Sequence, residues 1–156
     1  MKPNMKRSDL TNNDDIWNAV INVLSENGVP NENNVFHEAF LVFQYYSELE
    51  SGGHESLFHW FSSYIEEAGI ANYLQELTSV LEKIGAHEYA NIEKTYGREI
   101  WKNFIALENN EIDEEEFYHI IGQADGEYYK LDSQLGELLE AYFIAIHTDL
   151  IEVIED

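Results

Sequence analysis

The chain has 156 residues, and its 31 Asp and Glu against 8 Lys and Arg give a formal charge of −23. This balance excludes direct binding to nucleic acid or to anionic membrane, because proteins hold both through Lys and Arg. Hydrophobic residues make up 44% of the chain and cysteine is absent, so we expect a normal core without disulfides. The sequence contains no apolar run of membrane-span length and no secretory signal, so we expect a soluble, cytoplasmic protein.

Apolar residues recur at three- and four-residue steps along almost the whole chain, which predicts helices. The predicted helices cover about 14–27, 34–50, 54–68, 70–84, 86–96 and 98–108, with another beginning near 113 and a last one over 133–154. Strand-like alternation does not persist anywhere. We therefore predict an all-α fold, a single compact multi-helix domain of about seven to nine helices over 1–156, with 1–12 as a flexible N-terminal tail.

The charges are unevenly distributed. No Lys or Arg lies between Arg7 and Lys83, where 13 acids occur, and Lys130 is the single base among 15 acids from Phe104 onward. The stretch from Lys83 to Asn103 holds four bases and three acids, so it is nearly neutral. Most carboxylates thus lack a basic partner nearby in sequence, and their repulsion costs stability. A basic partner would be attracted by these unpaired carboxylates, which would give the repulsion a function. The simpler explanation of the acidic surface is that it keeps the protein soluble.

Motifs for metals, cofactors and catalysis are weak. His54 and His59 are five residues apart, but a zinc-protease helix needs two histidines four apart to face one metal. Glu116 and His119 match one Glu-x-x-His unit of a di-iron bundle, which needs two such units. No phosphate-binding glycine loop or calcium loop occurs. We expect no catalytic residues, no metal and no cofactor, and therefore a protein that is not an enzyme.

The densest acidic run is Asp113 to Glu116. Acids in a first helical turn favour the helix dipole and cap its free amides, so this run is expected to open a helix. Capping residues are also exposed, which leaves a second role in binding open.

Two segments carry a resemblance to a known family. FQYYSELESGGHESLFHWF (Phe43 to Phe61) joins an aromatic-rich helix to a Gly-Gly turn and a second aromatic-rich segment. LEKIGAHEYANIEKTYG (Leu81 to Gly97) is an apolar helix that ends in Ile-Gly-Ala and leads into another helix. Together with the C-terminal helices, these segments resemble the bacterial family of DNA mimic protein 19. This chain has Ser51 where that family typically has Asn, and His54 where it has an apolar or aromatic residue.

The resemblance implies an all-α fold and, for the best-described type, a dimer. It also implies a negative surface that imitates the DNA backbone and occupies the DNA-binding face of a basic protein, such as a transcription factor. A homodimer would carry −46, twice the −23 of one chain, so its interface is expected to avoid the acidic segments. The near-neutral stretch from Lys83 to Asn103 is the candidate interface.

The leading hypothesis is a non-enzymatic DNA mimic that binds a basic DNA-binding protein and competitively blocks its DNA site. An immunity or inhibitor protein for a basic toxin or nuclease is the alternative, because the same charges serve it; an acidic enzyme and a merely soluble domain follow. The expected contacts to the partner are carboxylates around the Gly-Gly turn and in the C-terminal third: Glu48, Glu50, Glu55, Asp113, Glu114, Glu115, Glu116, Asp125, Glu127 and Asp132.

Overall fold

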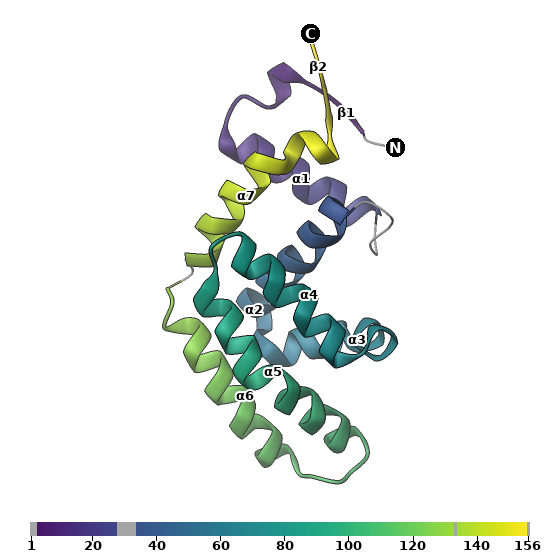
Figure 1. Ribbon diagram of the computed structural model, residues 1–156, viewed down its shortest axis with the longest axis vertical. Helices are drawn as coiled ribbons and strands as arrows, with labels where there is room; N and C mark the ends of the chain where they lie inside the picture. The colour runs from purple at the N-terminus through teal and green to yellow at the C-terminus, as the bar shows by residue number, and fades with distance from the viewer. Residues whose placement is uncertain (1–2, 28–33, 133, 156) are drawn as a thin grey trace.

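The computed structural model describes residues 3–27, 34–132 and 134–155. Helices make up most of these residues, so the predicted all-α fold class is confirmed (Figure 1). No helix in these ranges is long and apolar enough to cross a membrane. The elements are β1 (Asn4–Lys6), a 3-10 helix (Arg7–Asp9), α1 (Asn13–Asn27), α2 (Asn34–Trp60), α3 (Ser62–Ala68), α4 (Ile70–Lys83), α5 (His87–Glu108), α6 (Glu114–Tyr129), α7 (Gln134–Leu150) and β2 (Glu152–Ile154).

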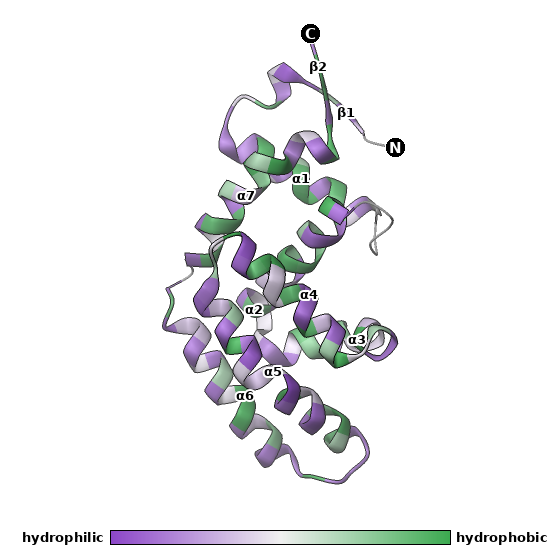
Figure 2. Ribbon diagram, viewed as in Figure 1, coloured by the Kyte–Doolittle hydropathy of each residue, from purple (hydrophilic) through white to green (hydrophobic). Residues whose placement is uncertain are grey.

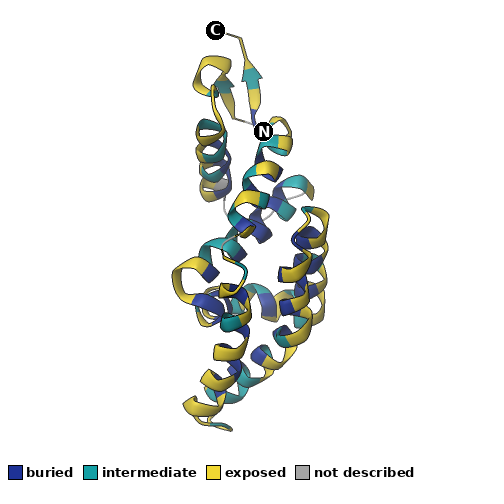
Figure 3. Ribbon diagram, turned by 90° about the vertical axis from the view of Figure 1, so that its left-hand side faces the viewer, coloured by how far each residue is buried: buried dark blue, intermediate teal, exposed yellow. Residues whose placement is uncertain are grey.

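The molecule is elongated, with both termini at one end and the α5–α6 loop at the other (Figure 1). α2 occupies the middle and contacts α1, α3, α4, α6 and α7, so it links the two ends. Each of the α-helices α1 to α7 carries hydrophobic and hydrophilic residues (Figure 2), and the buried residues lie where helices face one another (Figure 3). They form one hydrophobic cluster, whose burial supplies the main driving force for folding.

The Gly-Gly turn joins two helical segments of α2 through a kink at Gly53, so the helix break predicted at the glycine pair is confirmed. The sequence predicts separate helices over 34–50 and 54–68. The structure continues α2 through Gly53, whose non-helical backbone (φ 71°, ψ −162°) redirects the chain, and then begins α3 after Trp60. The arm from 54 to 60 thereby turns toward α6, which it contacts.

The two helices predicted over 86–96 and 98–108 are one continuous helix, α5. Gly97 was expected to separate them, yet its backbone is helical. A Cβ at Gly97 would lie 2.7 Å from a methyl group of Leu74 on α4, which is closer than real Cβ contacts. Gly97 therefore permits the close packing of α4 against α5 and does not end a helix.

Both termini differ from prediction. Residues 4–9, expected within a flexible tail, form β1 and the 3-10 helix. The last helix ends at Leu150, and residues 152–154 form β2 instead of its final turn. The two strands pair in parallel, with Met5 opposite Val153, and Glu155 accepts a hydrogen bond from Arg7 at 2.9 Å. Backbone pairing between the two ends therefore gives order to segments that have no helical stripe of their own.

Candidate partner-binding face

α6 packs closely against α2 at the kink formed by Gly53. The backbone of Gly53 lies in a region that L side chains rarely adopt. A Cβ at this position would also lie 2.4 Å from Oδ2 of Asp125 on α6. Glycine is therefore required at position 53 for two reasons: the turn needs its backbone conformation, and Asp125 occupies the space that a Cβ would take.

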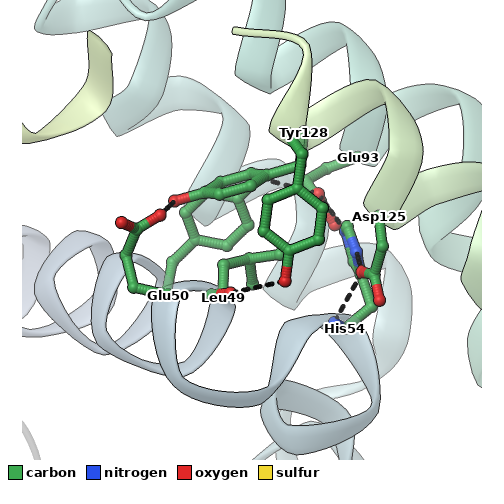
Figure 4. Close-up of polar contacts among 8 residues, drawn as sticks. Leu49, Glu50, His54, Glu93, Asp125 and Tyr128 are labelled. Atoms are coloured by element: carbon green, nitrogen blue, oxygen red, sulfur yellow. Dashed lines mark hydrogen bonds and ion pairs between the residues drawn. The ribbon is translucent and has the colours of Figure 1, made fainter. Parts of the chain in front are cut away.

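A buried ionic cluster joins three helices beneath this kink. His54 and Glu93 are fully buried, and the Asp125 side chain is 20% exposed. His54 Nε2 donates to Glu93 Oε2 at 2.6 Å, and Nδ1 donates to Asp125 Oδ1 at 2.7 Å. The His54 backbone amide donates to the same Asp125 oxygen at 2.9 Å, and the Tyr45 hydroxyl donates to Glu93 Oε2 at 2.9 Å. Figure 4 shows Glu93 and Asp125 both pointing toward His54.

The charge of this cluster follows from its geometry. Burial alone would lower the pKa of His54, but the charge of Glu93 and the hydrogen bonds to Asp125 and Glu93 outweigh burial and raise the pKa to about 9. His54 is therefore an imidazolium at neutral pH, held between two carboxylates. Within the described residues, no group of three or more His, Asp or Glu is arranged to hold a metal ion. The hydrogen bonds of the cluster link α2, α5 and α6 to one another.

Above this cluster, hydroxyl groups hold carboxylates on the surface between α2 and α6. The Tyr118 hydroxyl donates to Glu55 at 2.8 Å, and the Tyr128 hydroxyl donates to Glu50 at 2.8 Å. The hydrogen bond to Glu55 is the main reason that the pKa of Tyr118 is raised, with burial and the charges of Glu55 and Glu114 adding to it. Each tyrosine therefore stays a neutral donor, and its bond restricts the orientation of the neighbouring carboxylate.

These bonds join the acids around the α2 kink to tyrosines of α6, and Glu114 in the acidic first turn of α6 lies near enough to Tyr118 for its charge to raise the pKa of that tyrosine. Glu50 and Glu55 flank the kink of α2, and Tyr118 and Tyr128 project from α6. The Ser56 hydroxyl donates to Glu48, which is half-buried, so the third predicted acid near the kink is also held. We name this surface the kink face, defined by the carboxylates of Glu48, Glu50 and Glu55 together with the first turn of α6.

The remaining predicted acids occupy three kinds of environment. Asp113 caps α6 by accepting a hydrogen bond from the Glu116 amide at 3.0 Å, and Glu114, Glu115 and Glu116 are exposed in the first turn. Asp125 instead faces His54. Glu127 forms an ion pair with Lys130 at 3.2 Å, and Asp132 is exposed just after α6 with φ 51°. The structure thus places Asp125 and Glu127 in intramolecular contacts, whereas the first turn of α6 remains open to solvent.

Sequence reasoning missed the partners within the buried cluster. The sequence favours a structural histidine over a metal ligand at position 54, but it names neither Glu93 nor Asp125 as its partner. A signal for Glu93 exists: it follows Tyr89 by four residues and precedes Ile100 by seven, which places it on the buried stripe of α5. A carboxylate on an apolar stripe indicates a buried partner.

The near-neutral stretch lies at the centre of the molecule. Most of it belongs to α5, which packs against α4 and α6 and buries a face that includes Ile100 and Phe104. Two of its four bases form ion pairs within the chain: Lys83 contacts Glu38 at 2.7 Å, and Lys94 contacts Glu82 at 2.9 Å.

A comparison with known protein families covers the segment that contains the kink face. The sequence model of a family described as DMP19-like protein matches residues 30–147. The chain belongs to this family. The match includes all of α2 and α6, and so every residue of the kink face and of the buried cluster. No curated protein sequence and no solved structure matches the chain.

Proposed function

We propose that this DMP19-like protein acts without catalysis, as a DNA mimic whose kink face binds a basic DNA-binding protein and blocks its DNA site. The observation that supports the proposal best is the meeting of two acidic segments at one face, where hydroxyl donors orient Glu50 and Glu55. The family name points the same way. Orienting carboxylates before binding reduces the ordering cost of association.

The first turn of α6 has a charge spacing comparable to that of DNA. Consecutive helical residues rise about 1.5 Å along the axis, and duplex DNA carries one charge per about 1.7 Å of axis. Glu114, Glu115 and Glu116 supply three consecutive carboxylates at this axial rise, pointing about 100° apart around the helix, and Asp113 precedes them as the cap. A basic protein that is attracted to phosphates would be attracted here by the same long-range field.

The test begins with affinity capture from a source lysate at low salt, eluted with a salt gradient. If a basic DNA-binding protein is eluted, its binding to DNA is then measured with and without this chain, and the chain is expected to reduce that binding. Replacing Glu114, Glu115 and Glu116 together by Gln is expected to weaken the complex about tenfold at low salt and to reduce its salt dependence.

A matched triple variant tests whether the face matters or only the total charge. Asp14→Asn, Glu26→Gln and Glu152→Gln remove the same three charges from exposed positions on α1 and β2, at the other end of the molecule (Figure 1). This variant is expected to keep most of the affinity. Equal weakening by both triples would overturn the proposed face. Capture of a single cognate nuclease, inhibited with no DNA competition, would instead favour an immunity protein.

A further inference from the structure

Trp60 is the most conspicuous side chain on the surface. It ends α2 and is 71% exposed, although Trp is among the largest apolar side chains. Trp17 packs against Phe43 and Phe143, and Trp101 packs against Phe58 and Phe104, so the other two tryptophans contact the core. The His59 ring meets Trp60 edge-on, with ring centroids 5.2 Å apart. This contact leaves most of the indole open to solvent.

A hollow of about 350 Å³ lies beside Trp60, lined by Gly52, Glu55, Ser56, His59 and Trp60. No Lys or Arg is among these residues, and none occurs in the chain between Arg7 and Lys83. The lining therefore offers no Lys or Arg side chain to neutralise the carboxylate of Glu55. Tyr118 occupies one of the roughly four acceptor positions of this carboxylate and fixes its direction.

An exposed indole beside an oriented carboxylate is a combination suited to a guanidinium group. Arginine stacks on aromatic faces, donates to carboxylates through a planar fork, and is less strongly hydrated than lysine. Nucleic acid is disfavoured as an occupant, because phosphates would be repelled by Glu55 and Glu48. A purely apolar occupant would leave the carboxylate dehydrated and unpaired.

We propose that this hollow receives an arginine side chain of the basic partner, stacked on Trp60 and hydrogen-bonded to Glu55. This inference rests on the proposed function and gives it a specific contact, because DNA-binding proteins use arginine both for phosphates and for guanine edges. The first turn of α6 then supplies attraction to any cation, while the hollow selects arginine over lysine.

The experiment titrates the full chain with acetylated, amidated hexaarginine and hexalysine peptides, which carry equal charge, at one ionic strength. The indole N–H signals in two-dimensional NMR report on each of the three tryptophans. We expect hexaarginine to bind several-fold more tightly and to shift the Trp60 signal most. Trp60→Ala is expected to weaken hexaarginine about three- to fivefold and to leave hexalysine unchanged.

Two further variants sharpen the test. Glu55→Gln is expected to reduce the preference for hexaarginine in the same way. Tyr129→Ala, which removes another exposed aromatic side chain of α6 (55% exposed), is expected to preserve it. Equal binding of the two peptides, or an equal loss of both with Trp60→Ala, would overturn the arginine site and leave the acidic face standing.

Two other results of these experiments would overturn the arginine site for different reasons. If neither peptide binds, the arginine site and the proposed function both fail. If the free chain self-associates through Trp60, as shown by sedimentation that changes with Trp60→Ala, a second copy occupies the surface and the arginine site is overturned.

Discussion

The buried cluster and the kink face use the same kind of residue in opposite ways. In the cluster, the carboxylates of Glu93, which is fully buried, and of Asp125, whose side chain is 20% exposed, both face one imidazolium. On the kink face, Glu55 accepts a hydrogen bond from a tyrosine and stays exposed. One set of carboxylates holds helices together, and the other is available for binding.

α6 contributes side chains both to the buried cluster and to the kink face. Asp125 reaches inward to His54, while Tyr118, seven residues earlier, supports Glu55 at the surface. The comparison teaches that an acid count does not measure a binding surface, because burial and intramolecular partners remove carboxylates from it. Stability should therefore depend on the cluster, and affinity for a partner on the face.

The largest expected effect is the removal of a carboxylate from the cluster. Glu93→Ala leaves the protonated His54 and the Tyr45 hydroxyl without their acceptor, and breaking a buried pair in this way costs about 3–5 kcal/mol. Urea denaturation at pH 7 measures the loss. Glu99→Ala, an exposed position on the same helix, is expected to change the free energy of unfolding by less than about 0.5 kcal/mol. Similar losses in both variants would contradict a structural role for the cluster.

The second prediction concerns the glycine that admits α6. Gly53→Ala introduces a strained backbone and a Cβ within 2.4 Å of Asp125, so we expect a loss of roughly 2–3 kcal/mol. Gly122→Ala on α6 has open space for its Cβ and is expected to stabilise by about 0.5–1 kcal/mol. Thermal or urea unfolding should therefore give opposite signs for two chemically identical changes. The same sign in both would show that the kink tolerates a side chain.

The third prediction is a pH dependence of stability. The folded-state pKa of His54, about 9, lies above its ordinary value of 6.5, so its contribution is complete below 6.5 and disappears as pH rises through 9. Because one unit of pKa difference corresponds to about 1.4 kcal/mol, linkage predicts a loss of about 3 kcal/mol in unfolding free energy across this window. His54→Gln, which cannot carry the charge, should flatten the profile. A slope that persists in this variant would assign the titration to another group.

The smallest effects on stability are expected from removing the hydroxyl groups of Tyr128 and Tyr118, which donate hydrogen bonds to Glu50 and Glu55. Tyr128 is buried, so Tyr128→Phe is expected to cost about 1 kcal/mol through the lost bond to Glu50. Tyr118 is 43% exposed, so Tyr118→Phe should cost about 0.5 kcal/mol or less. The latter variant frees Glu55 and should weaken binding of the captured partner more than it weakens folding. An unchanged affinity would show that Tyr118 does not orient Glu55 for binding.

The helical elements were predictable because helical periodicity is a local property. The apolar stripes of α1 and α4 were identified within about a residue of their ends. Glycines were harder, because the same residue type serves different needs. Gly53 does redirect the chain, as expected, but Gly97 lies inside a helix because Leu74 packs on it. A glycine inside a periodic pattern indicates either a break or a close contact, and only the neighbour from another helix decides between them.

The pairing of the termini was not predictable from local pattern. Strands of three residues are too short to show alternation, and Met5 pairs with Val153 from the opposite end of the chain. Such non-local pairing depends on how α1 and α7 bring the two ends together, as their mutual contact does here.

Composition determined the excess of acids, and the order of the residues determined their concentration on either side of a near-neutral stretch and, through apolar periodicity, the all-α class. Only the folded arrangement decided which acids meet His54, which accept hydrogen bonds from tyrosines, and which stay open at the first turn of α6. The reason is that the burial of a carboxylate and its hydrogen-bond donors are provided by other helices. In this protein α2 and α6, more than fifty residues apart in the sequence, provide them for each other.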